Sequence, residues 1–322
     1  MADARISVAK ENLSADKHNP PAEPRGAFAA LLLGNAALAS GPLFVRMADV
    51  GPVAAGFWRL ALALPVLALC AWAQWRATMR AAAPLAGGAH RGIGQWRGIG
   101  AMAVLGGIFF AADLASWHMG IVKTTMANAT LFGNSASLFL AIATWVIARR
   151  APRWSEGAAI ALATAGAGIL LRESGQQGAA RMVGDALCLL AGLLYTGYVL
   201  AMQRARNAMA SWSALALSTG AGALPLALFA MAMGETVVPQ IWSAVLLLAL
   251  FSQIIGQGLL IYALPHFSAL VIGLTLLTQP ALAAAIGWMA YGEGLGTMDY
   301  VGGAMVAAAL VLVRLPTPAA PA

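Results

Sequence analysis

The chain has 322 residues, of which 61% are hydrophobic and only 10% are charged, and its mean hydropathy is +0.78. Because charged residues make up about 25% of a typical soluble domain, this composition excludes an ordinary soluble protein. The formal net charge of +7 does not indicate nucleic-acid binding, since the basic residues stand in short breaks beside apolar runs, the distribution that orients membrane helices.

Apolar runs of about 20 residues recur along the chain, the length that crosses a bilayer core of about 30 Å as a helix. Strand-like alternation is missing from these runs, so helices are expected to satisfy the backbone in lipid. The 35 glycines and many alanines are typical of membrane helices that pack closely. We therefore predict an all-α, multi-pass protein whose main partner is the lipid bilayer.

The first 25 residues are polar and contain Pro20, Pro21 and Pro24, so residues 1–25 are predicted to be a disordered cytoplasmic tail. The first apolar run, residues 27–45, ends in "ALASGP", which resembles a signal-peptide cleavage site. A partly acidic leader of this length is unusual in a signal peptide, so an uncleaved first span is predicted. A flexible loop at 74–96 and a cytoplasmic tail at 316–322 are also predicted. Further spans are expected at 51–73, 97–119, 124–148, 156–172, 183–203, 211–233, 240–262, 268–291 and 299–314.

The basic residues predict the orientation of these ten spans. If the N-terminus is cytoplasmic, nearly all of the 19 Lys and Arg residues fall on the cytoplasmic side. Arg59 lies within a span, and the opposite side carries only Arg46, Lys123, Arg172 and Arg181. This bias predicts that both termini are cytoplasmic.

Two stretches, 124–172 and 268–315, share one pattern: an apolar run, a short charged break and a second apolar run. Their breaks have opposite charge, because the first contains Arg149, Arg150 and Arg153 and the second contains Glu293 and Asp299. Ten spans divide into five and five, and a tandem repeat of an odd number of helices places its second copy upside down. We predict two inverted five-helix repeats, 26–172 and 183–315, joined by an external linker at 173–182.

Four segments carry a family resemblance: the Gly51-Pro52 opening of span two with Arg59, "DLASWHMGIVKTTMANATLFGN", "SQIIGQGLLIYAL" and "TLLTQPALAAAIGWMAYGEGLG". On these segments the sequence resembles EamA-type members of the drug/metabolite transporter superfamily over nearly all of 26–315. The resemblance implies a carrier of small metabolites, often an exporter of amino acids or related compounds, with its site between the halves. The halves differ where Ser137 stands at the position of Pro280 and Arg150 at that of Glu293, so they are not expected to be functionally equivalent.

Ionisable residues within membrane spans are costly and usually face a cavity or a partner. Arg59 in span two and Asp113 in span three lie at similar depth from one side of the membrane. They either form a structural ion pair or bind the two ends of a zwitterionic substrate. His118, at the end of span three, is either an interfacial side chain or, with Asp113, a candidate for proton exchange during transport.

Neutral polar residues form a second set of candidates for substrate binding. In a continuous helix, Asn128 and Asn134 lie about 120° apart, whereas Gln253 and Gln257 share one face. Amides and hydroxyls this deep need partners, which interhelical hydrogen bonds supply as well as a ligand does. Pro280 removes a backbone hydrogen bond within span nine and is either a hinge or a fixed kink. The candidates are Trp117, Asn128, Asn134, Tyr195, Gln253, Gln257 and Gln279.

Enzymatic motifs such as HExxH, GxSxG and a P-loop are missing, and acids within the membrane are almost limited to Asp113. Cys70 and Cys188 lie inside apolar runs, and no CxxC or His/Cys cluster exists, so neither a cofactor nor a metal site is predicted. We predict an inner-membrane secondary transporter of small molecules that works by alternating access. The alternatives are a membrane-embedded enzyme of lipid or isoprenoid metabolism and a structural or assembly protein.

Overall fold

The computed structural model describes residues 26–82, 93–149, 154–206, 209–263, 266–267, 275–276 and 278–312. Within these ranges the regular elements are helices, which confirms the all-α prediction. The predicted tails, Arg150, Arg153 and residues 268–274 of the predicted ninth span lie outside the described residues. Eight helices of the described ranges are long and apolar enough to cross a membrane: Ala27–Met47, Pro52–Thr78, Gly98–Ile121, Met126–Ile147, Trp154–Gln176, Ala179–Ala205, Ser211–Ala232 and Trp242–Leu260.

The first three spans are built from α2 (Ala27–Ala39), α3 (Gly41–Met47), α4 (Pro52–Ala82) and α5 (Ile93–Ile121). The first span is interrupted at Ser40, which precedes Gly41 and Pro42. Proline is tolerated in the first turn of α3 because the N–H that it lacks has no partner within the helix there. The chain therefore bends between α2 and α3 without leaving the membrane span.

The fourth span is a broken helix, whereas a continuous one was predicted at 124–148. It consists of α6 (Met126–Gly133) and α7 (Ala136–Ala148), separated at Asn134 and Ser135. Thr125 caps α6, because its side chain accepts a hydrogen bond from the Asn128 amide at 3.3 Å. Asn134 still forms a helical hydrogen bond to the Thr130 carbonyl at 3.0 Å, so the interruption follows both Asn128 and Asn134.

The fifth to seventh spans are α8 (Trp154–Gln176), α9 (Ala179–Arg206) and α10 (Ser211–Ala232). Only Gln177 and Gly178 separate α8 from α9, so the predicted linker 173–182 is mostly helical. Gly178 has φ = 130°, a backbone conformation that side chains disfavour, and this allows the chain to reverse abruptly. The linker was predicted too long because its polar residues were interpreted as a loop, whereas polar side chains also occur at helix ends.

The eighth span combines α11 (Trp242–Leu248), the π-helix η1 (Ala249–Gly256) and α12 (Gln257–Ala263). Two further helices, α14 (Thr278–Tyr291) and α15 (Thr297–Leu312), complete the described part of the C-terminal half. A π-helix of this length is rare, and π-helical turns occur frequently at functional sites. The apolar run at 240–262 does not predict this π-helix.

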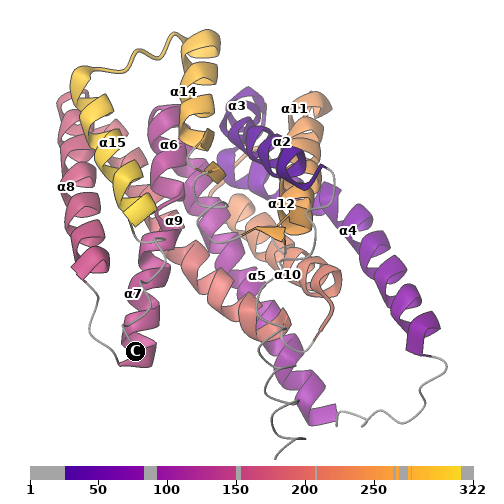
Figure 1. The fold of residues 1–322 in the computed structure, drawn as a ribbon. Coiled ribbons are helices and arrows are strands. Elements are labelled where there is room, and N and C mark those ends of the chain that lie inside the picture. Colours follow the sequence, from indigo (N-terminus) through magenta and orange to yellow (C-terminus); the bar gives the residue numbers. More distant parts are fainter. Residues whose placement is uncertain are drawn as a thin grey trace, which may run out of the picture.

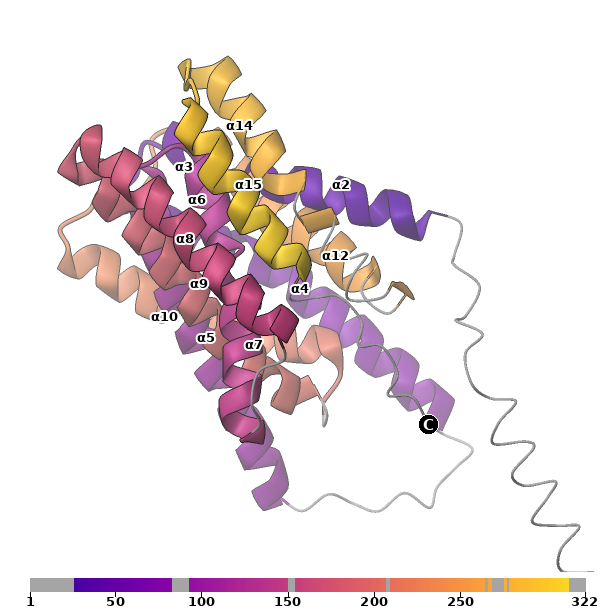
Figure 2. The ribbon, with the colours of Figure 1, turned by 60° about the vertical axis from the view of Figure 1, so that its left-hand side comes forward.

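The helices pack into one bundle in which spans far apart in the sequence lie side by side. Figures 1 and 2 show α8 against α15 on one flank, and α5 packs against α9 and α10. The buried interior consists largely of Ala, Val and Leu side chains, whereas many Leu side chains point outward, such as Leu33, Leu69 and Leu224. Apolar exposure on this scale suits contact with lipid and agrees with a multi-pass membrane protein.

Helices α5 and α10 approach closely at Gly107 and Gly222. A Cβ atom added at Gly107 would lie 2.4 Å from the Ser218 carbonyl oxygen, so the helices would have to separate. We expect Gly107→Ala to destabilise the protein by about 1–3 kcal/mol, measured by thermal unfolding in detergent. Gly100→Ala on the same helix is the matched control, because nothing lies within 4 Å of its Cβ position. Equal stability of the two variants would contradict close α5–α10 packing.

Candidate substrate site

A cavity of about 380 Å³ lies in the middle of the bundle, between spans of both halves. Its lining comes from α2, α4, α5, the α6–α7 break, α9, η1, α12 and α14, with Leu276 from a short described segment. Apolar side chains such as Leu38, Phe110 and Leu260 form much of the wall, with polar groups spaced around it. Seven of the predicted candidate residues line this cavity: Arg59, Asp113, Trp117, Asn134, Tyr195, Gln257 and Gln279.

Arg59 and Asp113 are both buried and both line the cavity, each about 12 Å along its helix from the same end of the bundle. Among the ion pairs of the described residues, within 4.0 Å, none joins Arg59 to Asp113. The two side chains thus form no direct ion pair in this conformation, and both predicted alternatives stay predictions. The two opposite charges instead face a shared space.

The Arg59 guanidinium has a hydrogen-bond partner at one nitrogen and none at another. Its Nε atom donates a hydrogen bond to Gln253 Oε1 at 3.1 Å, and its Cζ atom lies 5.8 Å from the centre of the Trp117 ring. Its Nη1 atom is buried and has no hydrogen-bond partner within the described residues. This donor is unsatisfied in a residue that lines the cavity.

Gln253 and Gln257 differ in how they contact the site. Gln253 lies in η1, is fully buried and contacts Arg59 from behind the cavity wall, whereas Gln257 begins α12 and lines the cavity. Because Gln253 donates no hydrogen bond from its Nε2 atom within the described residues but accepts one from Arg59, its contact with the site runs through that arginine. Gln253 therefore positions Arg59, and Gln257 reaches the cavity.

A chain of hydrogen-bonded side-chain amides lies beside the cavity and is centred on Gln279. Its Nε2 atom donates to Asn35 Oδ1 at 2.7 Å, and its Oε1 atom accepts from Asn134 Nδ2 at 3.5 Å. Asn35 on α2 was missed by the sequence analysis, although a lone amide inside an apolar run was a visible signal. The chain links the first span, the α6–α7 break and α14 beside one cavity.

Trp117 and the tyrosines form the aromatic side of the cavity. The Trp117 indole N–H donates to the Ala129 carbonyl at 3.0 Å, which fixes the ring against α6. The Phe110 ring stacks on Tyr198 at 4.8 Å, and Tyr195 lies 5.3 Å from Tyr198. Rigid aromatic faces of this kind suit the apolar part of a small ligand.

His118 is fully buried, so the predicted interfacial alternative for this residue is wrong. Its Nδ1 atom lies 3.0 Å from the Pro52 carbonyl oxygen at the start of α4, and the ring contacts the backbone at Gly56. The close approach of α4 and α5 covers this side chain. His118 is not among the residues that line the cavity, and its proposed part in proton exchange stays a prediction.

Pro280 lies in α14, and residues 275–276 just before this helix are helical as well. Its position within the ninth span therefore stays as predicted. Residues 268–274 and 277 lie outside the described residues. The hinge at Pro280 therefore stays a prediction.

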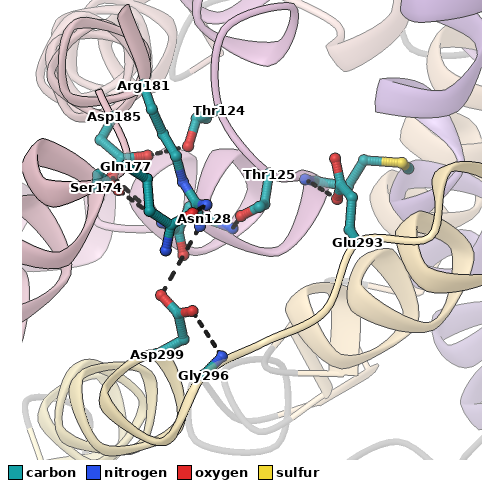
Figure 3. Close-up of polar contacts among 11 residues, drawn as sticks. Thr124, Thr125, Asn128, Ser174, Gln177, Arg181, Asp185, Glu293, Gly296 and Asp299 are labelled. Atoms are coloured by element: carbon teal, nitrogen blue, oxygen red, sulfur yellow. Dashed lines mark hydrogen bonds and ion pairs between the residues drawn. The ribbon is translucent and has the colours of Figure 1, made fainter. Parts of the chain in front are cut away.

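Asn128 belongs to a second polar cluster and not to the cavity. Figure 3 shows its amide with Ser174 of α8 and Asp185 of α9. Asp185 is fully buried and also accepts hydrogen bonds from the hydroxyls of Thr124 and Ser174. The expectation that intramembrane acids are almost limited to Asp113 was wrong, because Asp185 lies inside the sixth span.

At one end of the bundle, Arg46 at the end of α3 connects segments that are far apart in the sequence. Its Nη1 atom forms an ion pair with Glu293 Oε1 at 2.6 Å, and its Nε atom donates to the Ile121 carbonyl at 3.0 Å. Glu293 Oε2 accepts from the Met126 amide at 2.9 Å, so the pair also holds the start of α6. We call Arg46 and Glu293 the latch, since they join α3, α6 and the segment after α14.

The same end of the bundle is fastened at the loop between α10 and α11. Glu235 accepts hydrogen bonds from the amides of Val53 and Ala54 at the start of α4. Asp49 accepts from the amides of Gln240 and Ile241 just before α11. These polar contacts join the loop between α10 and α11 to the segment around the start of α4.

Comparison with known proteins identifies part of the chain. Residues 182–315 match the model of the EamA-like transporter family. A crystal structure of another protein shares 15% sequence identity with this chain and has a TM-score of 0.54, over 89% of this chain and 94% of the other. At this identity the likeness concerns the fold alone. None of the curated proteins compared matches the chain.

Proposed function

We propose, from the EamA-like transporter domain at residues 182–315, that the whole chain is a secondary transporter that exports amino acids or related small metabolites. The observation that carries this proposal is the central cavity, in which Arg59 and Asp113 face a shared space beside Trp117. The Arg59 Nη1 donor suits a substrate carboxylate, and the Asp113 carboxylate suits an ammonium group. A cavity of about 380 Å³ is of the size that binds small molecules.

The pattern of helix contacts supports two repeats of five spans. If α4 corresponds to α10, α5 to the α11–α12 span and α2 to α9, then the α5–α9 contact has its counterpart in α2–α12. Likewise α5–α10 corresponds to α4–η1, and α6–α9 corresponds to α2–α14. Three further pairs, α4–α10, α6–α14 and α8–α15, join equivalent spans to each other. Such pairing is expected of repeats related by a twofold axis.

Alternating access follows from this arrangement, with the cavity between the repeats and the latch at one end. We assign the latch end to the exterior of the inner membrane and both termini to the cytoplasm, on the distribution of Lys and Arg. The α6–α7 break supports a transport site, because broken helices with free backbone groups form the binding sites of many carriers. Export then requires that the latch open after substrate enters from the cytoplasm.

Tryptophan fluorescence of the purified protein tests this function. A substrate that enters the cavity contacts Trp117, so we expect the titrated amino acid to change the emission of the wild type and Trp117→Phe to lose most of that change. Trp154→Phe is the control, since the Trp154 side chain is 83% exposed and lies outside the cavity. If no member of a broad set of amino acids and related metabolites changed the emission, the proposed substrate class would be wrong.

A further inference from the structure

A buried carboxylate outside the cavity sits where the two halves of the chain meet. Asp185 lies six residues after the start of α9, about 9 Å along the helix from the latch end of the bundle. Its side chain is fully buried, and so is that of Ser174 beside it. Figure 3 shows Asp185 enclosed by the turn before α6, by α6 itself and by α8.

The partners of Asp185 are neutral. The Thr124 hydroxyl donates to Oδ1, while the Ser174 hydroxyl and Asn128 Nδ2, the latter at 3.2 Å, bond to Oδ2. A hydroxyl can donate to a carboxylate or, after rotation, accept a hydrogen bond from a carboxylic acid. The cluster can therefore satisfy Asp185 with hydrogen bonds in both protonation states, which a partner that only donates cannot do.

Among the described residues, no charged group forms a direct ion pair with Asp185. Arg181, one turn earlier on α9, is directed to Gln177 and to Asp299 of α15, whose Oδ1 lies 3.9 Å from its Nη2. Among the ion pairs of the described residues, none within 4.0 Å joins Arg181 to Asp185. The other titratable groups on surrounding elements are Lys123 after α5, Glu173 on α8, Cys188 on α9 and Asp299 on α15.

A carboxylate without a direct ion pair is costly at this depth in a membrane protein, and binding a proton removes that cost. A structural role alone would be served by the uncharged amide of asparagine. The two rotatable hydroxyls and the missing ion pair are the features expected of a group that gains and loses a proton.

The cluster is mechanically connected to the cavity through α6. Asn128 lies on α6, and the same short helix presents Thr130 and Gly133 to the cavity, with Asn134 following at its end. Because α6 is separated from α7 by a break, a change of hydrogen bonding at Asn128 can move α6 without moving α7. Glu293 of the latch binds the first amide of the same helix.

We propose that Asp185, with Thr124, Asn128 and Ser174, is a proton-binding site. A proton from the aqueous side binds a carboxylate oxygen of Asp185, and the hydroxyl bonded to that oxygen rotates from donor to acceptor. On deprotonation the proton returns to water and the hydroxyl donates again, so no other bond forms or breaks. Its use in coupling a proton gradient to movement of α6 rests on the proposed transport function.

Infrared difference spectroscopy of the purified full-length protein in lipid vesicles tests the site. Spectra recorded between two pH values report the carbonyl band of each carboxylic acid that titrates. We expect the wild type to show a band of a buried acid that Asp185→Asn removes. Asp113→Asn and Asp299→Asn are matched controls that replace neighbouring acids in the same way, and both should retain that band.

A second variant protects the test against misfolding of Asp185→Asn. Ser174→Ala keeps the acid but removes one hydrogen bond, so the band should persist and shift to higher frequency. A spectrum unchanged in both Asp185→Asn and Ser174→Ala would overturn the proposal. So would a band that responds to Na⁺ at fixed pH and not to pH. A titrating Asp185 band in a protein that gives no Trp117 response would leave the proton site intact and contradict the transport function.

Discussion

Replacing Arg59 with alanine is expected to abolish export. The change removes the only buried guanidinium among the described cavity-lining residues and leaves a substrate carboxylate without its charged donor. A charge-assisted hydrogen bond contributes about 1.5–3 kcal/mol, so we expect binding to weaken about 10- to 100-fold. Metabolite profiling measures the outcome, since cells that overproduce the wild type should lose one intracellular metabolite and cells with Arg59→Ala should not.

Two controls separate binding from folding. Arg76→Ala removes an exposed arginine from the same helix, where Arg76 lies over the Trp72 ring, and should leave the profile of the wild type unchanged. Arg59→Lys keeps the charge but lacks the planar fork that contacts Gln253 and the cavity together, so it should recover only part of the export. A metabolite equally depleted with the wild type and with Arg59→Ala would show that Arg59 does not bind the substrate.

Breaking the latch is expected to open the cavity from the external side. Glu293→Gln leaves the partly buried Arg46 without its ionic partner, at a cost of about 2 kcal/mol to the closed conformation. Labelling of a cavity cysteine, Ser137→Cys, measures the change after Cys70 and Cys188 are replaced by alanine. We expect a membrane-impermeant maleimide added outside cells to react at least about tenfold faster in the Glu293→Gln protein.

Glu235→Gln is the matched control for the latch. Glu235 lies at the same end of the bundle but caps α4, which stays packed against α10, so its replacement should not speed labelling. Equal rates in Glu293→Gln and the parent protein would contradict the role of the latch. Faster labelling only when the maleimide is added to inverted membranes would place the latch end in the cytoplasm and reverse the proposed orientation.

The sequence by itself determined the class of protein and most of its helices. Apolar runs of spanning length leave helices as the structure that satisfies the backbone in lipid, and this depends on composition and length alone. It also identified most polar residues of the cavity, because a polar group inside an apolar run is conspicuous. Arg59, Asp113 and Gln279 were recognised in this way before any contact was known.

Helix interruptions were decided by local geometry that hydropathy does not encode. The fourth span is interrupted at Asn134 and Ser135, and the eighth contains a π-helix, although both spans are apolar. Asn134 lines the cavity, whereas Asn128 contacts Asp185.

Only the tertiary structure decided which polar groups meet. Arg46 and Glu293 are 247 residues apart in sequence, and Asn128 is 57 residues from Asp185, so no periodicity relates the partners. A charged residue inside an apolar run is visible from the sequence alone. The free-energy cost of burying it in the membrane can therefore be recognised from that residue and its neighbours along the chain. The partner that offsets this cost comes from helix packing, which is why the class of the protein was readable in advance and the latch and the proton site were not.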